Sequence, residues 1–359
     1  MDADTALRAQ RTRSQLLAGQ PASPIEVVVT MGAIQAQNRA AALSAIGVRS
    51  PGSTIDDLEA AFDSGAIVRS WTMRGTLHIV PAEDLGWMLS LTADRTRTAI
   101  ARESRQLGIS ESEYDRGADV IAQHVAEHGP ATRSDAVATL DRAGVGGGGE
   151  SAYRYIRGAA LRRLVAWGPM RGRQPLLVAA PVGPELERDE ALARFITTYL
   201  RGHGPATVRD FAWWSGLTLT DARTARAAAG AALQTFGSDD DAMLITADAP
   251  PAAAAETPSG GQRIGVRVVP AWDEYVLGYR DRGHVLPDRF APRVSPSGNG
   301  VFLPAILSEG RVVGTWTQSI DKTGLHAAAD PFERLTAAER RGFEKAVAEL
   351  ARFLGVPMA

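Results

Sequence analysis

The chain repeats one segment, His128-Gly-Pro-Ala-Thr-Arg-Ser-Asp135, 75 residues later as His203-Gly-Pro-Ala-Thr-Val-Arg-Asp210. An amphipathic helix is predicted before each copy, over 118–127 and 191–201. In each copy Gly-Pro closes that helix, and Thr132 or Thr207 is placed to cap the next one. The repeat therefore predicts two copies of one helical unit.

The two units continue in parallel beyond the repeat. A helix rich in alanine and arginine is predicted over 152–164 in the first and over 220–233 in the second, and a short apolar strand follows at 176–178 and 243–246. Three helices followed by a β-hairpin are typical of a winged-helix module. In the hairpin over 165–178, Gly-Pro predicts one bend and Arg171-Gly172-Arg173 the tip, which suits a wing that touches phosphates.

A third, more divergent copy is predicted near the N-terminus. Ser53 and Thr54 are placed to cap a helix that continues to Phe62, Gly65 ends it, and alternating residues over 68–80 predict a pair of strands. The expected fold class is therefore α+β: three tandem winged-helix modules with a β-rich C-terminal part and a closing C-terminal helix.

The expected domains are 1–110 (an N-terminal winged-helix-like unit), 111–182 (the second unit), 183–262 (the third unit and a linker) and 263–359 (the β-rich region with its terminal helix). Strands are predicted over 264–269, 301–307 and 312–317, with a hairpin turn at 308–311. A helix is predicted over 337–354, and its apolar stripe is expected to be core: Phe343, Val347, Leu350 and Leu354. The glycine-rich run 144–149 is expected to be a flexible loop, and the Ala- and Pro-rich stretch 249–261 a linker.

Composition excludes several classes of protein. The chain of 359 residues has no cysteine, which excludes disulfides, thiolate metal sites and cysteine nucleophiles. No stretch approaches the roughly 20 apolar residues that span a membrane, and the first residues lack the apolar run of a signal peptide. His124 and His128 lie one helical turn apart, but no third ligand with suitable spacing accompanies them. We expect a cytoplasmic protein, associated with the nucleoid when bound to DNA, with no membrane partner, no metal and no cofactor.

The net charge of −2 argues against a protein that coats nucleic acid by bulk attraction. The basic residues are nevertheless unusual, because all except Lys322 and Lys345 are arginines; a GC-rich genome would also explain this. Six of them fall in a window of twenty residues without Asp or Glu, a charge pattern that suits a DNA backbone. The six are Arg154, Arg157, Arg162, Arg163, Arg171 and Arg173.

Gln35 and Gln37 lie in an apolar stretch, 27–43, where a buried amide needs hydrogen-bond partners. On one continuous helix, residues two apart point about 200° away from each other. Both amides can therefore face one cleft only if the helix breaks, and Gly32 and Asn38 favour a break there. The simpler interpretation is two surface glutamines on an alanine-rich helix.

Three segments carry a resemblance to a known family. The run Trp71-Thr-Met-Arg-Gly-Thr-Leu-His78, followed by Ala82-Glu-Asp84, resembles the hallmark segment of a bacterial tandem winged-helix DNA-binding superfamily. The block Ala271-Trp-Asp-Glu-Tyr-Val-Leu-Gly-Tyr-Arg-Asp-Arg282 and the strand pair over 301–316 resemble the same family. Within it, the AlkZ-like DNA glycosylases carry a Gln-x-Gln motif, and the sister YcaQ-like branch carries Gln-x-Asp. Gln35-Ala36-Gln37 is similar to the first form, with Ala where the family tends to have a bulkier apolar residue.

The resemblance implies a monofunctional DNA glycosylase that acts as a monomer on double-stranded DNA with alkylated purines. It would hydrolyse the N-glycosidic bond of a cationic base, such as N7-alkylguanine, a bulky adduct or an interstrand crosslink, and leave an abasic site. An amide oxygen can place a water against C1′ and favour the developing positive charge, but it is no strong general base. Gln37 is expected to position the water, and Gln35 to support it or to hold the sugar-phosphate. Because no lysine lies near the motif, no Schiff-base lyase step is expected.

Further DNA contacts are expected from Asn38, Arg69, Arg74, His78, Arg280 and Arg282. Structural alternatives stay open for several polar residues. His78 suits a buried strand position as well as a DNA contact, and Arg74 could pair with Glu83 or Asp84. Trp213 and Trp214 suit packing, with base stacking as the alternative.

The acidic pair Asp273 and Glu274 resembles a catalytic carboxylate pair, but both are expected to anchor Arg280 or Arg282. Two other functions also stay open. One is a non-enzymatic winged-helix transcription regulator, which would footprint one sequence as a dimer. The other is a protein that sequesters a genotoxic small molecule. Housekeeping repair and antibiotic self-resistance are equally compatible with the sequence.

Overall fold

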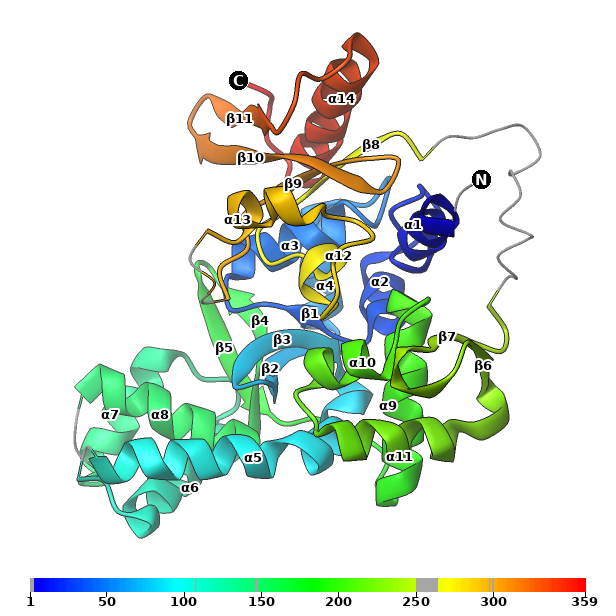
Figure 1. The fold of residues 1–359 in the computed structure, drawn as a ribbon. Helices are drawn as coiled ribbons and strands as arrows, with labels where there is room; N and C mark the ends of the chain where they lie inside the picture. Colours follow the sequence, from blue (N-terminus) through cyan, green and yellow to red (C-terminus); the bar gives the residue numbers. More distant parts are fainter. Residues whose placement is uncertain (1–2, 107, 146–147, 250–263, 297, 299) are drawn as a thin grey trace. The chain divides into compact units, whose positions relative to one another are not determined.

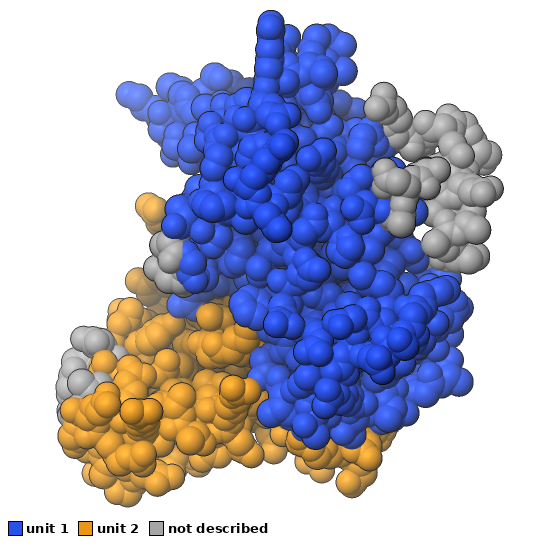
Figure 2. All heavy atoms as spheres, in the orientation of Figure 1, with its two compact units in different colours: residues 1–58, 192–359 blue, residues 59–191 orange. Residues whose placement is uncertain are grey.

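The computed structural model describes residues 3–106, 108–145, 148–249, 264–296, 298 and 300–359 (Figure 1). The chain forms two compact units, one of residues 1–58 and 192–359 and the other of residues 59–191 (Figure 2). The boundaries between them fall inside two helices, α4 (Ile55–Asp63) and α9 (Arg188–His203). The four domains expected from the sequence stay a prediction.

The unit of residues 59–191 is built on four antiparallel strands in the order β3-β2-β4-β5. Its elements after α4 are β2 (Ile67–Met73), β3 (Thr76–Pro81), η1 (Ala82–Asp84), α5 (Leu85–Gln106), α6 (Glu111–His128), α7 (Arg133–Arg142), α8 (Gly148–Leu161), β4 (Val165–Arg171) and β5 (Gln174–Ala179). The hairpins predicted over 68–80 and 165–178 are both confirmed. Gly172 occupies the tip of the second with a φ of 60°, whereas Gly168 and Pro169 lie inside β4 at a shift of register.

The unit of residues 1–58 and 192–359 holds the other elements. They are α1 (Ala3–Ser14), α2 (Pro24–Met31), β1 (Ile34–Gln35), α3 (Arg39–Gly47), α10 (Val208–Ser215), α11 (Leu219–Ala229), η2 (Gly230–Ala232), β6 (Leu233–Phe236), η3 (Asp239–Asp241), β7 (Met243–Thr246), β8 (Val266–Val269), α12 (Glu274–Leu277), η5 (Asp288–Phe290), α13 (Ala291–Val294), β9 (Ala305–Ser308), β10 (Arg311–Asp321), β11 (Gly324–Pro331) and α14 (Ala337–Phe353). This composition confirms the α+β class, and the number of winged-helix modules stays a prediction.

The repeated segment caps helices as expected. The Thr132 and Thr207 hydroxyls accept hydrogen bonds from the backbone N–H of Asp135 and Asp210, at 3.1 Å in both cases. Each aspartate in turn accepts from the backbone N–H of its threonine, at 2.8 and 3.0 Å. Both capping boxes are therefore complete, and each copy continues through helices into a hairpin.

Several predicted boundaries are wrong for identifiable backbone reasons. The helix expected over 152–164 ends at Leu161, and Arg163 has a φ of 59°. The helix expected over 220–233 ends at Ala229, because Gly230 has a φ of 47°. Gly148 and Gly149 belong to α8 instead of a loop, and residues 146–147 lie outside the described residues. Except for Ala249, the expected linker 249–261 also lies outside them.

The C-terminal part is an antiparallel sheet in the order β11-β10-β9-β8, with α14 packed against β8 and β11 (Figure 1). The strand expected over 301–307 begins at Ala305, after Pro304, which has no N–H to donate to the sheet. The sequence pattern missed β11. Of the predicted apolar stripe, Phe343, Val347 and Leu350 are buried in the core as expected, whereas Leu354 follows the end of α14 and is half-buried.

Among the described residues, we find no helix that combines the length and the apolar character needed to cross a membrane.

Candidate active site

The two glutamines lie between helices. Helix α2 ends at Met31, and Gly32 follows with a φ of 72°. A Cβ atom on Gly32 would come within 2.4 Å of Thr198 Cγ2, so a larger residue does not fit there. The strand β1 then holds two residues, and α3 begins at Arg39. The predicted break of the helix is therefore confirmed, and the interpretation as two surface glutamines on a continuous helix is wrong.

We call residues 35–37 the Gln-x-Gln turn. Gln35 is buried, whereas Gln37 is exposed. The side-chain oxygen Oε1 of Gln35 accepts a hydrogen bond from the backbone N–H of Gln37 at 3.3 Å. The two amides thus have different environments: Gln35 fixes the backbone of the turn, and Gln37 extends from it toward solvent.

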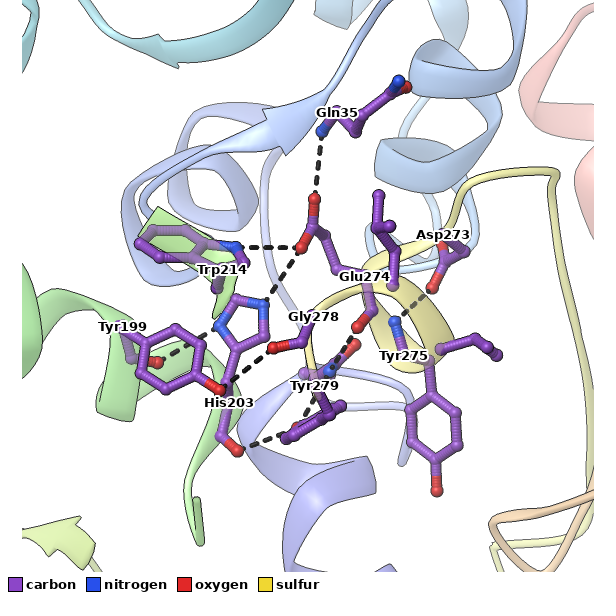
Figure 3. Close-up of polar contacts among 12 residues, drawn as sticks. Gln35, Tyr199, His203, Trp214, Asp273, Glu274, Tyr275, Gly278 and Tyr279 are labelled. Carbon is purple, nitrogen blue, oxygen red and sulfur yellow. Dashed lines mark hydrogen bonds and ion pairs between the residues drawn. The ribbon is translucent and has the colours of Figure 1, made fainter. Parts of the chain in front are cut away.

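A buried carboxylate binds the backbone at the start of the Gln-x-Gln turn (Figure 3). Glu274, the first residue of α12, is 1% exposed. Its Oε1 accepts from the backbone N–H of Gln35 at 3.1 Å. Its Oε2 accepts from Trp214 Nε1 at 3.0 Å and lies 3.3 Å from His203 Nε2. Glu274 therefore joins the turn to α9 and α10.

His203 completes this buried network. Its Nδ1 lies 3.1 Å from the carbonyl oxygen of Tyr199, and the two rings stack at 4.7 Å with 15° between their planes. Burial raises the pKa of the Tyr199 hydroxyl well above its usual value, and this hydroxyl donates to the Gly278 carbonyl at 3.0 Å. The surroundings of Glu274 are thus aromatic and closed to water.

The neighbouring carboxylate has a different partner. Asp273 forms a bidentate ion pair with Arg49, with both N···O distances at 2.7 Å and both side chains 1% exposed. Arg49 also donates to the backbone oxygens of Gln15 and Ala45 and to Gln15 Oε1, at 2.8 to 2.9 Å. All five guanidinium N–H groups are therefore used in the bonds to Asp273, Gln15 and Ala45.

The expectation that Asp273 and Glu274 anchor Arg280 or Arg282 is wrong. The true partner of Asp273 is Arg49, which is 224 residues away in sequence and was not indicated by any local spacing. The backbone N–H of Arg280 donates instead to Asp210 at 2.9 Å, and Arg282 Nε donates to the Val276 carbonyl at 2.7 Å. The sequence did indicate the block 271–282, but it missed the contact of Glu274 with Gln35 and His203.

This geometry can be compared with known proteins. The model of the family described as DNA glycosylase AlkZ-like matches residues 28–353. The chain belongs to the AlkZ-like DNA glycosylase family. It is a DNA glycosylase, and the alternative of a non-enzymatic regulator is not favoured.

This AlkZ-like glycosylase is similar to a protein and to a solved structure from Streptomyces sahachiroi. The chain is 26% identical over 360 residues to an interstrand DNA cross-link repair glycosylase, with 93% of this chain and 91% of the relative covered. It also resembles the solved structure of the DNA glycosylase AlkZ, with a TM-score of 0.78 and 24% identity over 99% of this chain and 98% of the other. The fold is therefore shared over nearly the full length of both chains.

The predicted DNA contacts of the unit of residues 1–58 and 192–359 differ in exposure. The Arg280 side chain is exposed. The Arg282 guanidinium is packed against the rings of Trp213 and Phe302, at 5.3 and 4.8 Å from their centroids, and burial lowers its pKa. Trp213 is 43% exposed, whereas Trp214 is buried, so packing is confirmed for Trp214. DNA contact by Arg280 and Arg282 stays a prediction.

His78 and Arg74 contact each other in the unit of residues 59–191. His78 is buried; its Nε2 lies 3.3 Å from an Arg74 guanidinium nitrogen and its Nδ1 lies 3.1 Å from the Thr76 carbonyl. Burial favours the structural interpretation of His78. Arg69 and Arg74 are half-buried, and their contact with DNA stays a prediction.

The arginine window of this AlkZ-like glycosylase is less cationic than its sequence indicates. Arg157 pairs with Glu103 of α5 at 3.0 Å, and Arg162 pairs with Asp119 of α6 at 2.8 Å. These acids lie outside the window in sequence and reach it through packing of the helices. Arg163, Arg171 and Arg173 are exposed, and the last two flank the hairpin tip at Gly172. Arg154 is half-buried, and DNA contact by any of the six stays a prediction.

Asn38 is the N-cap of α3, because its Oδ1 accepts from the backbone N–H of Ala41 at 3.1 Å. We expect Asn38→Ala to lower the free energy of unfolding by about 1 kcal/mol through loss of this cap. Asn38→Asp retains the cap and adds a negative charge beside Gln37. If Asn38 contacts DNA, Asn38→Asp will therefore weaken binding to a duplex without lowering the melting temperature. Unchanged affinity in a fluorescence anisotropy titration would limit Asn38 to its structural role.

Proposed function

We propose that the protein is a monofunctional glycosylase for cationic N-alkylated purines in duplex DNA, N7-alkylguanine above all. It hydrolyses the N-glycosidic bond and leaves an abasic site. The observation that carries this proposal is the Gln-x-Gln turn, in which a buried, hydrogen-bonded amide supports an exposed one.

The chemistry of the substrate suits neutral side chains. Alkylation at N7 places a positive charge on the base, which then leaves toward an oxocarbenium-like sugar without strong acid assistance. The carbonyl oxygen of an amide can orient a water toward C1′, and its dipole favours the positive charge that develops there. Because an amide is no strong general base, the reaction is restricted to labile, charged lesions.

The two glutamines take different roles in this proposal. Gln37 orients the water, since its side chain is exposed at the turn. Gln35 positions Gln37, since its Oε1 is bonded to the backbone N–H of Gln37. The alternative role of Gln35, direct contact with the sugar-phosphate, is less favoured because only 7% of the residue is exposed.

The substrate class extends to bulky adducts and interstrand crosslinks. This part of the proposal is supported by the relative from Streptomyces sahachiroi, which is named for cross-link repair. The strand itself stays intact, because a lyase step needs an amine and neither lysine, Lys322 or Lys345, lies near the glutamines in sequence.

The test is a single-turnover base-release assay on three duplexes, containing N7-methylguanine, an N7-linked crosslink or uracil. We expect release of N7-methylguanine and unhooking of the crosslink, with no release of uracil. Strands should break only after treatment with an abasic-site endonuclease. A protein that releases no alkylated base, yet footprints one undamaged sequence, would be a regulator. Tight binding of the free alkylating agent without DNA would instead support sequestration.

A further inference from the structure

We infer that Glu274 is a positioning residue of this glycosylase, whose buried carboxylate orients Gln37 by holding Gln35. The inference rests on the proposed function of the Gln-x-Gln turn. It gives a role to a carboxylate that is 1% exposed and lies among buried side chains.

A continuous chain of hydrogen bonds connects Glu274 with the exposed glutamine. Glu274 Oε1 accepts from the Gln35 backbone N–H at 3.1 Å (Figure 3). Gln35 Oε1 in turn accepts from the Gln37 backbone N–H at 3.3 Å. The first bond holds the backbone N–H of Gln35, and the second holds the backbone N–H of Gln37. The orientation of the Gln37 backbone is therefore set from inside the protein.

The other carboxylate oxygen is held just as firmly. Oε2 accepts from Trp214 Nε1 at 3.0 Å and lies 3.3 Å from His203 Nε2, and both rings are fully buried. Phe195 and Tyr199 pack against Trp214, with ring centroids 5.3 and 5.0 Å away. Because both carboxylate oxygens of Glu274 accept hydrogen bonds, the carboxylate cannot rotate without breaking its bond to Gln35 or to Trp214.

The donors around Glu274 match an ionised carboxylate. A buried carboxylate is costly unless several donors or a positive charge compensate it. A carbonyl oxygen only accepts, so His203 Nδ1 must carry a hydrogen toward Tyr199. His203 Nε2 lies 3.3 Å from Glu274 Oε2. The Gln35 and Trp214 N–H groups donate to the two carboxylate oxygens.

Glu274 and its neighbour hold both ends of one segment. Asp273 binds Arg49, which follows the end of α3, while Glu274 binds Gln35, which precedes its start. The start of α12 thus binds the Arg49 side chain after α3 and the Gln35 backbone N–H before it. Asp273 stabilises the fold through its ion pair with Arg49, and Glu274 orients the Gln-x-Gln turn through its bond to Gln35.

The direct test is Glu274→Gln, which keeps the shape of the side chain. Its NH2 group can only donate, so it must face either the Gln35 N–H or the Trp214 N–H, and each of these is itself a donor. We expect the single-turnover rate of N7-methylguanine release to fall by roughly 10- to 100-fold, with unchanged affinity for an undamaged duplex. The matched control is Glu309→Gln, because Glu309 also accepts from two backbone N–H groups of the same unit, at 3.2 and 3.3 Å. The control should retain the wild-type rate.

A double variant separates positioning from general destabilisation. If Glu274 acts through Gln37, Glu274→Gln will lower the rate in the wild-type background but not further in Gln37→Ala. An equal fold-loss in both backgrounds would overturn the inference. Should Glu274→Gln fail to fold, Trp214→Phe removes a single donor from Oε2 and should lower the rate in the same Gln37-dependent way.

Amide hydrogen exchange gives a readout that does not depend on activity. Exchange at the Gln35 and Gln37 backbone amides should be faster in Glu274→Gln than in the wild type, and unchanged in Glu309→Gln. Unchanged exchange in Glu274→Gln would overturn the inference even if the wild type releases alkylated bases. If the wild type releases none, the proposed function fails, and faster exchange would still show that Glu274 holds the turn.

Discussion

Replacing Gln37 with alanine is expected to lower the single-turnover rate of N7-methylguanine release by roughly 100-fold, because the water is no longer oriented toward C1′. The melting temperature should stay at the wild-type value, since Gln37 is exposed. Gln35→Ala should also lower the rate, and it should cost about 1 kcal/mol of stability because the Gln37 N–H loses its acceptor.

The losses of rate in Gln35→Ala and Gln37→Ala should not be additive. In the double variant the rate should be close to that of Gln37→Ala alone, because Gln35 acts through Gln37. The matched control is Gln234→Ala, since Gln234 is an exposed glutamine of β6 in the same unit. Wild-type activity in Gln37→Ala would refute its proposed role. If Gln35→Ala lost activity while Gln37→Ala retained the wild-type rate, the water would be assigned to Gln35 instead.

Asp273→Asn is expected to lower the free energy of unfolding by about 3–5 kcal/mol, the usual cost of breaking a buried ion pair. The substitution leaves the Arg49 guanidinium buried without a counter-ion, at a place where both side chains are 1% exposed. The free energy of unfolding of native proteins is usually about 5–15 kcal/mol, so this single change removes a large fraction of it. The measurement is the midpoint of chemical denaturation.

The control for this second effect is an exposed ion pair of the same unit. Arg289 and Glu333 lie 2.8 Å apart with side chains 65% and 71% exposed, so Glu333→Gln should leave the midpoint nearly unchanged. If Asp273→Asn were as stable as Glu333→Gln, the hydrogen bonds that Arg49 donates to Gln15 and Ala45 would alone suffice to bury its guanidinium.

The local features of the fold followed from the sequence. The capping boxes at Thr132 and Thr207 join residues three apart, so the repeat alone predicted them. The break before Gln35 followed in the same way, because Gly32 needs a positive φ and Asn38 caps the next helix. The strand β11 was missed because its segment, Gly324–Pro331, lacks the alternation of apolar residues that marks a strand.

The electrostatic partners could not be predicted in this way. The window 154–173 contains no acid, yet Glu103 and Asp119 neutralise two of its arginines. Sequence spacing is informative about contacts within a helix or hairpin, whereas these pairs form where separate helices pack. The same reason explains why Arg280 and Arg282 were wrongly expected beside Asp273.

The sequence by itself determined the family, the two capped repeats and the place of the two glutamines between helices. The tertiary structure alone decided that Gln35 is buried and Gln37 exposed, and that Glu274, 239 residues after Gln35, binds the Gln35 backbone. The physical reason is that a buried carboxylate takes whichever donors surround it in the folded core. Those donors come from α9, α10 and β1, and only the packing of these elements brings them together.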